Sequence, residues 1–197
     1  IMIHPIVAYG DPVLRKCAAP IDANYPELKK LIEDMFETMY EASGIGLAAP
    51  QIGLPIRLFI VDATPFEDDE DLSKEDRDLL KTFKRVFINA QIVEESGQEW
   101  VFNEGCLSIP EIREDVFRKE HVTLRYQDET FKEHTETFSG IAARIIQHEY
   151  DHIDGILFTD KLSSLKKRMI KSKLTQISKG LIRGDYRMKY PLAKKKR

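Results

Sequence analysis

Two histidines and a glutamate occur in the pattern H-E-x-x-H, at His148, Glu149 and His152. On a helix, positions i and i+4 lie one turn apart on the same face, so both imidazoles can bind one metal ion while Glu149 stands beside it as a proton acceptor. In a chain with 5 histidines, chance produces this pattern only on the order of 0.01 times, which disfavours two unrelated surface histidines. Ile141 and Ile145 lie on the same ridge, so the histidines continue an apolar face that is expected to point inward.

Two histidines leave a zinc-type site short of a ligand. The third histidine of one metalloprotease group would fall on Phe158, and no glutamate follows Glu149, so both familiar protease patterns fail. The remaining candidates are His4, His121, His134, Cys17 and Cys106. Cys106 is favoured because Gly105 allows a close backbone approach and a thiolate binds divalent metals strongly. A Cys-His-His set leaves a fourth position open for water, which is typical of a catalytic site.

A third segment, residues 44–51, has the sequence GIGLAAPQ. It formally matches the dinucleotide-binding pattern G-x-G-x-x-A, but a predicted helix precedes it where a strand is needed. Pro50 would also break the helix that should follow. Small residues that end in one amide, Gln51, instead suit a backbone that lies close to a ligand.

Several secondary-structure elements must position these segments. Apolar periodicity predicts helices over residues 25–42, 139–153 and 163–179, and Ser139 is expected to cap the second of them. Strands are predicted over residues 58–61, 86–92, 99–102, 116–117 and 121–126, with turns at 95–97 and 127–129. The acidic stretch 66–78 is predicted to be a solvated insertion or loop, partly helical. Without repeats or an internal linker, this order predicts a single α+β domain.

Charge and composition limit the class of protein. The formal net charge is -3, yet residues 161–197 carry 14 Lys and Arg against a single acid, Asp185. The body is therefore acidic and the C-terminal region basic. Two cysteines are too few for a disulfide framework, which favours a reducing compartment. No apolar run approaches the ~18 residues of a membrane span, and the first ten residues lack the features of a secretory signal, so we expect a cytoplasmic protein without membrane partners.

Together, the three chemical segments resemble the peptide deformylase family. That family is marked, in this order, by G-x-G-x-A-A-x-Q, E-G-C-x-S and Q-H-E-x-D-H, which here occupy residues 44–51, 104–108 and 147–152. The resemblance runs from about residue 10 to about Leu162. It implies a catalytic domain over residues 1–162, followed by a basic C-terminal helix and tail over 163–197. The implied fold is α+β, with antiparallel sheets around a central metal-binding helix and further helices near both ends.

The resemblance also implies a role for each site residue. Cys106, His148 and His152 would be the metal ligands, and Glu149 the general base and acid. Gln51 and the backbone N–H of Leu107 would donate hydrogen bonds to the oxyanion. The family works best with Fe2+, while Zn2+, Ni2+ or Co2+ can occupy the site. Its reaction releases formate from the N-formylmethionyl end of newly made bacterial polypeptides.

Substrate contacts follow from the same motif register. The backbones of Ile45, Gly46 and Gly105 would pair with an extended peptide. A methionine-sized pocket would be lined by Ile45, Phe102, Ile141, Ile145 and the His148 ring. Arg113 resembles the arginine near the downstream carbonyls of the peptide, although an ordinary loop arginine is an equal alternative. Arg144 lies one turn before His148, so we expect it to point away from the pocket or to pair with an acid.

Two rival functions share parts of the pattern. A metalloprotease that cuts internal peptide bonds would use the H-E-x-x-H pair, but its third ligand is missing. A metal-stabilised module that binds RNA or the ribosome would use the basic residues 163–197. For the deformylase hypothesis, those residues predict a transient ribosome contact and no DNA partner.

Overall fold

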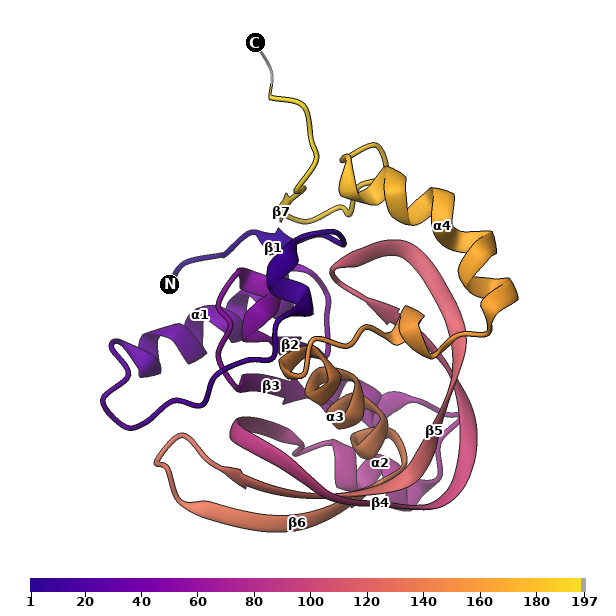
Figure 1. The fold of residues 1–197 in the computed structure, drawn as a ribbon. Coiled ribbons are helices and arrows are strands. Elements are labelled where there is room, and N and C mark those ends of the chain that lie inside the picture. Colours follow the sequence, from indigo (N-terminus) through magenta and orange to yellow (C-terminus); the bar gives the residue numbers. More distant parts are fainter. Residues whose placement is uncertain (196–197) are drawn as a thin grey trace.

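The computed structural model describes residues 1–195 as one α+β domain (Figure 1). Its helices are α1 (Leu28–Glu41), α2 (Lys74–Leu80), α3 (Gly140–Ile153) and α4 (Ser164–Ser178). Its strands are β1 (Ile6–Val7), β2 (Gly46–Ala48), β3 (Leu58–Asp62), β4 (Lys84–Cys106), β5 (Ile109–Gln127), β6 (Glu133–Ser139) and β7 (Met188–Lys189). Short 3-10 helices are η1 (Pro12–Arg15), η2 (Ala49–Ile52), η3 (Thr64–Asp68) and η4 (Phe158–Lys161).

An antiparallel sheet in the order β2-β3-β4-β5-β6 curves around α3 (Figure 1). Strands β4 and β5 form one long twisted ribbon, which turns back through Leu107 and Ser108 and pairs Cys106 with Ile109. A second, parallel pair joins β1 near the N-terminus to β7 near the C-terminus. The predicted arrangement of antiparallel strands around a central helix is therefore confirmed, and the parallel terminal pair is an addition to it.

Helix α3 lies at the centre of the domain, and nearly all of its residues are buried. Its apolar side chains pack against aromatic and branched residues of the sheet, including Phe59, Phe87 and Leu124. Each such side chain contributes about 1.5–3 kcal/mol when it is fully buried. The helix stops before Gly155, whose φ of 75° and whose distance to Arg15 allow no side chain: a Cβ would lie 2.6 Å from the Arg15 carbonyl oxygen. The close contact at Gly155 therefore fixes the end of α3 just after His152, the last residue of the H-E-x-x-H motif.

The two outer helices also agree with their predicted positions. Helix α1 packs against β2 and β3 through its Ile32, Met35 and Met39 side chains. Helix α4 contacts β5 and buries Ile170 and Leu174 in a cluster that includes residues near both chain ends. Among residues 1–195, the structure contains no helix with the length and apolar character needed to cross a membrane.

Three local predictions were wrong or incomplete. Residues 95–97 are not a turn, because β4 continues through them with a register irregularity at which Gly97 adopts a φ of 82°. Strand β6 was missed because it is an edge strand in which only Phe138 is buried, so it lacks an apolar pattern. The Ser139 side chain does not cap α3; it lies 2.7 Å from Nδ1 of His121.

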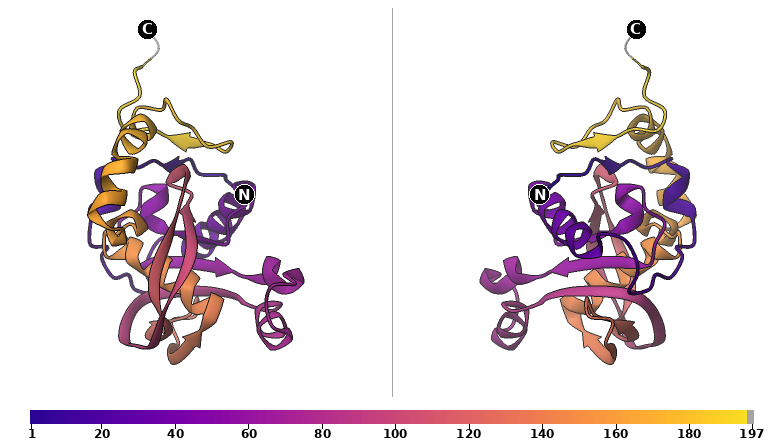
Figure 2. Two further views of the ribbon diagram at one scale, coloured as in Figure 1. Left: turned by 90° about the vertical axis from the view of Figure 1, so that its right-hand side faces the viewer. Right: turned by 90° about the vertical axis from the view of Figure 1, so that its left-hand side faces the viewer.

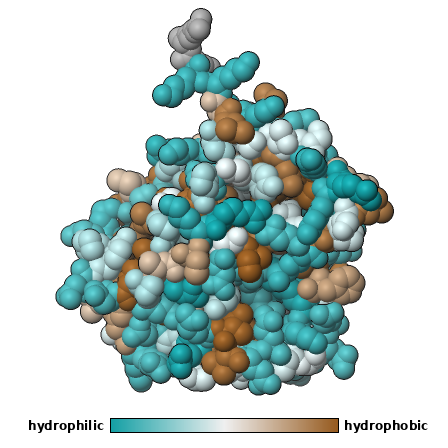
Figure 3. Space-filling model, in the orientation of Figure 1, coloured by the Kyte–Doolittle hydropathy of each residue, from teal (hydrophilic) through white to brown (hydrophobic). Residues whose placement is uncertain are grey.

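The acidic stretch 66–78 is partly helical, as predicted, and forms parts of η3 and α2. Ser73 is the N-cap of α2, and its hydroxyl accepts a hydrogen bond from the Asp76 amide. Figure 2 shows this pair of short helices projecting from the side of the domain, away from α3. The face shown in Figure 3 is mostly hydrophilic, with apolar residues in small separate groups.

Candidate active site

Cys106, His148 and His152 converge at the tip of the β4–β5 ribbon and the C-terminal half of α3. Each offers one ligand atom, and these atoms all lie within 4.8 Å of one another. The Cys106 sulfur is 3.4 Å from Nε2 of His152. A thiolate with two imidazoles is a donor set that fits a divalent transition metal.

The other candidate ligands lie elsewhere. His121 is next to Ser139, and Nε2 of His134 is 2.7 Å from a carboxylate oxygen of Asp128. His4 lies 3.6 Å from Asp34, and Cys17 is exposed. Of the five candidates for the third ligand, the structure thus brings only Cys106 to the two histidines.

A buried cluster of charges holds the helix side of this site. Glu104 accepts hydrogen bonds from Arg118 at 2.8 and 3.0 Å, from Arg144 at 2.8 Å and from Nδ1 of His148 at 2.8 Å. Arg118 also donates to Asp151 at 2.7 Å. Burial alone would raise the pKa of Glu104, but the hydrogen bonds from His148 and Arg118 outweigh it and lower that pKa. Because the carboxylate holds Nδ1 of His148, Nε2 is the ring atom left for a metal.

The pairing of Arg144 with Glu104 confirms the expectation that this arginine meets an acid. Its guanidinium also lies 4.6 Å from the centre of the Trp100 ring and donates to the Trp100 carbonyl at 2.7 Å. Arg144 nevertheless contributes to the wall of the cavity described below. A buried positive charge is tolerated there because these contacts replace water.

Glu149 is buried beside the three ligands. Gly46 lies directly against it, since a Cβ on Gly46 would be 2.6 Å from Oε1 of Glu149. Oε2 is buried and has no hydrogen-bond partner among residues 1–195. Burial raises the pKa of Glu149 to about 7, so this carboxyl group can both take up and release a proton near neutral pH.

The two histidines differ in their electrostatics. Burial lowers the pKa of His152 well below its ordinary value, which keeps the ring neutral, as a metal ligand must be. Burial acts in the same direction on His148, but hydrogen bonds with Cys106 and Glu104 outweigh it and raise the pKa of His148 to about 10. A proton and a metal cation therefore compete for the free nitrogen of His148.

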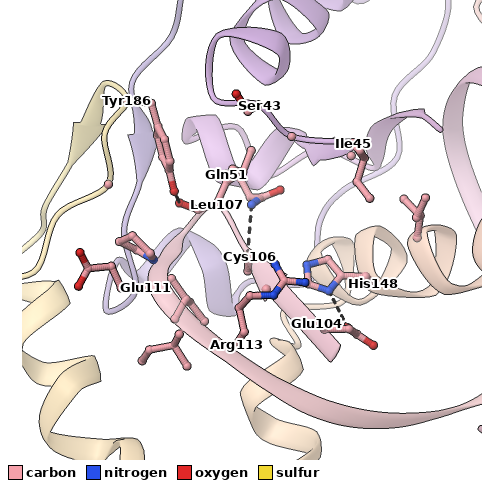
Figure 4. Close-up of a pocket in the computed structure, with 18 of the residues that line it drawn as sticks. Ser43, Ile45, Gln51, Glu104, Cys106, Leu107, Glu111, Arg113, His148 and Tyr186 are labelled. Carbon is pink, nitrogen blue, oxygen red and sulfur yellow. Dashed lines mark hydrogen bonds and ion pairs between the residues drawn. The ribbon is translucent and has the colours of Figure 1, made fainter. Parts of the chain in front are cut away.

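Gln51 and Leu107 form the opposite side of the site. The Gln51 side chain is buried, and its oxygen accepts a hydrogen bond from the Ala48 amide at 2.9 Å. Its nitrogen donates to the Ser108 hydroxyl at 3.3 Å and lies 3.5 Å from the Cys106 sulfur (Figure 4). Leu107 packs against Gly44, where a Cβ would be 2.7 Å from Cδ1 of Leu107.

A cavity of about 680 Å³ opens onto Cys106, His148 and Glu149. Six of the predicted substrate-binding residues line it: Ile45, Gly46, Phe102, Gly105, Arg113 and Ile145. The seventh, Ile141, does not line the cavity: it packs in the same core cluster as Ile145 but lies one helical turn farther from the ligands. The Arg113 side chain crosses Gly105 and donates to the Asn103 side chain at 2.9 Å and to its carbonyl at 2.7 Å.

Sequence reasoning missed two groups of residues at the site. Glu104 and Asp151 were noted only as parts of motifs, and Arg118 carried no distinguishing pattern at all. The cavity is also lined by residues 183–186 near the C-terminus, including Tyr186, whose hydroxyl donates to the Leu107 carbonyl at 2.6 Å. No local pattern marks these residues, because they reach the site only through the pairing of β7 with β1.

Comparison with known proteins gives a consistent result. The polypeptide deformylase family model matches residues 3–168. Peptide deformylases from Christiangramia forsetii and Flavobacterium johnsoniae are 63% and 62% identical over 196 residues, 100% of both chains in each case. The crystal structure of a Legionella pneumophila peptide deformylase has a TM-score of 0.75 and 40% identity, covering 89% of this chain and 95% of that one. A peptide deformylase from Thermus thermophilus has a TM-score of 0.75 and 40% identity, covering 89% and 98%.

Proposed function

The chain belongs to the polypeptide deformylase family, and from that premise we propose how its own residues perform the reaction of the family. It is a hydrolase of protein biosynthesis that removes the formyl group from N-terminal formylmethionine. The observation that supports our assignment of roles is the meeting of Cys106, His148 and Glu149 at one cavity, with the His152 ligand atom within 4.8 Å of those of Cys106 and His148.

Cys106, His148 and His152 would hold the divalent metal ion that the family requires. When bound, such an ion supplies Lewis acidity, which activates water and polarises a carbonyl oxygen. By resemblance to the family, Fe2+ is the proposed ion in the cell, while Zn2+, Ni2+ or Co2+ occupy the site in preparations. The donor set supports this range, because thiolate and imidazole suit several of these metals.

Glu149 moves the proton. Its carboxylate takes a proton from the attacking water, whose oxygen forms a bond to the formyl carbon. The same group then gives that proton to the nitrogen of methionine as the carbon–nitrogen bond breaks, so formate and a free amino terminus leave. Close contact with Gly46 and burial fix the carboxyl group for both transfers.

Gln51 and Leu107 stabilise the negative charge that develops on the formyl oxygen. The Gln51 amide nitrogen and the backbone N–H of Leu107 donate hydrogen bonds to it. Deletion of one such donor costs roughly 2.7–4 kcal/mol of transition-state stabilisation in other enzymes. The Gln51 nitrogen donates to the Cys106 sulfur at 3.5 Å, which places this donor directly beside the metal ligands.

The peptide binds in an extended form along the backbones of Ile45, Gly46 and Gly105. The methionine side chain enters a pocket between Ile45, Phe102, Ile145 and the His148 ring, and Ile141 supports that pocket from the core. Arg113 faces the downstream carbonyls of the peptide. All of these residues except Ile141 line the cavity, which supports the assignment.

Residues 1–162 are proposed as the catalytic domain and 163–197 as a basic helix and tail that makes transient contact with the ribosome; 196–197 lie outside the described residues. Helix α4 supports this role, since it buries Ile170 and Leu174 and exposes basic residues. Exposed lysines and arginines suit RNA phosphates, and no DNA partner is proposed. A bacterial cytoplasmic location follows, because ribosomes release this substrate there.

Formate release tests the function directly. Anaerobically prepared, iron-loaded protein should release formate from a formyl-Met peptide, and Cys106→Ala should lose both the metal and the activity. Cys17→Ala is the matched control, because Cys17 is exposed and outside the site. Cleavage of an unblocked peptide without formate release would instead support the protease alternative.

For the ribosome contact, the measurement is co-sedimentation at low salt. Charge reversal of the exposed Lys167, Arg168, Lys171 and Lys173 should abolish it while formate release from small peptides persists. Unchanged co-sedimentation would remove this part of the proposal.

A further inference from the structure

The turn that follows Cys106 is held by hydrogen bonds from both ends of the chain. The Ser108 carbonyl accepts from the Tyr9 amide at 2.8 Å. The Leu107 carbonyl accepts from the Tyr186 hydroxyl at 2.6 Å (Figure 4). Both turn carbonyls are thus satisfied from outside the β4–β5 ribbon, although the two donors are far apart in the sequence.

The parallel pair of β1 and β7 explains how these donors reach the turn. Tyr9 follows β1 by two positions, and Tyr186 precedes β7 by two positions. Backbone hydrogen bonds of 3.0 Å from Ile6 to the Arg187 carbonyl and 2.9 Å from Ala8 to the Lys189 carbonyl join the two segments. Figure 2 shows the C-terminal strand lying beside the N-terminal one. The location of Tyr186 is therefore defined by backbone pairing on its C-terminal side.

Residues 183–186 also form part of the cavity wall. Arg183, Gly184, Asp185 and Tyr186 line the same cavity as Glu149 and Cys106. The Tyr190 hydroxyl accepts a hydrogen bond from the Gly184 amide at 3.1 Å, which closes this segment on itself. The segment lies beyond residues 3–168, the part of the chain that matches the family model.

We propose that Tyr186 is a positioning residue for deformylation, which acts by fixing the Leu107 backbone through its hydroxyl. This inference rests on the proposed role of the Leu107 N–H as an oxyanion donor. An oxyanion donor acts only when it is 2.7–3.1 Å from the developing charge, and small misplacements at an active site are costly. With its carbonyl held by Tyr186 and its side chain packed against Gly44, Leu107 has little freedom to turn its N–H away.

The test is Tyr186→Phe, which removes the hydroxyl and keeps the ring. Because the donor itself remains, we expect kcat to fall by about tenfold, less than the effect of deleting an oxyanion donor, with KM within about twofold of the wild-type value. Metal content should stay at the wild-type value, and Tm should fall by only a few degrees, as expected for the loss of one hydrogen bond. Tyr190→Phe is the matched control, since its hydroxyl contacts the same segment but not the turn, and its kcat should stay near wild type.

Three results would overturn the proposal. An unchanged kcat would show that the Leu107 N–H needs no help from Tyr186. A rise in KM alone would make Tyr186 part of the peptide-binding wall. An equal loss of kcat in Tyr190→Phe would indicate general loosening of the segment. Failure of the wild-type protein to release formate in the same assay would count against the proposed function instead. The failure of the Tyr186 proposal and the failure of the proposed function are therefore distinguishable.

Discussion

The two sides of the cavity are built in different ways. On the helix side, His148, Glu149 and His152 follow one another on α3, and buried ion pairs around Glu104 brace them. On the turn side, Leu107 and Gln51 come from separate segments, which, among residues 1–195, are held by hydrogen bonds without ion pairs. Cys106 lies where the two sides meet.

Because the two sides are held by different interactions, substitutions on them should have different effects on stability and rate. Removal of one partner from a buried charge cluster leaves other charges unpaired, which costs stability. Loss of one hydrogen bond at the turn leaves the fold intact but shifts a donor, which costs rate. We therefore expect substitutions in the charged cluster to lower stability and metal affinity, and substitutions at the turn mainly to lower kcat.

Glu149→Gln should have the largest effect on rate. The amide fills the same space against Gly46 but can neither take nor give the proton, so kcat should fall by roughly a thousandfold. Metal content should be unchanged, because Glu149 is not among the grouped ligands. Formate release and metal analysis on the same preparations check both parts, with Glu95→Gln as an exposed control. Retained activity would show that another group carries the proton.

Gln51→Ala should have the next largest effect and belongs to the turn side. It removes a proposed oxyanion donor, so kcat should fall by about a hundredfold or more. Its buried side chain also joins Ala48 to Ser108, which predicts some loss of stability as well. Steady-state kinetics together with thermal unfolding separate these effects, and Gln98→Ala is the exposed control. A change in Tm without a change in kcat would leave Gln51 as a structural residue.

The comparison also separates what the sequence could predict from what it could not. The helix side was predictable because His148, Glu149 and His152 share one turn of one helix, and helix geometry depends only on local spacing. The positions of most strands along the chain were predictable for a similar reason, since each apolar run marks a buried element. Gly97 misled this reasoning, because a glycine that serves a bulge has the same local sequence as a turn.

The parts that could not be predicted depend on distant pairing. Glu104 meets Arg118, which is four residues beyond its direct partner Glu114 on β5, and it meets Arg144 because α3 packs against that strand. Tyr186 reaches Leu107 only through the pairing of β1 with β7. Periodicity contains no information on such pairings, so the residues that hold the site were harder to find than those proposed to perform its chemistry.

Glu104→Gln tests the charged cluster on the helix side. Two buried arginines would lose their shared carboxylate, so the free energy of unfolding should fall by about 3–5 kcal/mol. His148 would also lose its anionic partner, which should weaken metal affinity by about tenfold to a hundredfold. Urea unfolding of the metal-loaded protein and metal competition measure the two quantities, with Glu99→Gln on the same strand as control. Normal stability would show that the ion pairs do not brace the helix side.

Arg113→Ala should have the smallest effect, because it changes the rim of the cavity and neither of its two sides. In the structure the Arg113 guanidinium already donates to the Asn103 side chain and carbonyl, so binding a substrate carbonyl exchanges one hydrogen bond for another. A net hydrogen bond contributes about 0.5–1.5 kcal/mol, which corresponds to a rise in KM of roughly two- to tenfold with kcat unchanged.

Longer formyl-Met peptides should show the rise and a formyl-Met amide should not, because only the longer peptides have downstream carbonyls. Arg125→Ala, which is exposed on the same strand, should leave both substrates unaffected. A loss of kcat in Arg113→Ala would mean that this residue of the rim also positions Leu107. The turn side of the cavity would then include the whole tip of the β4–β5 ribbon.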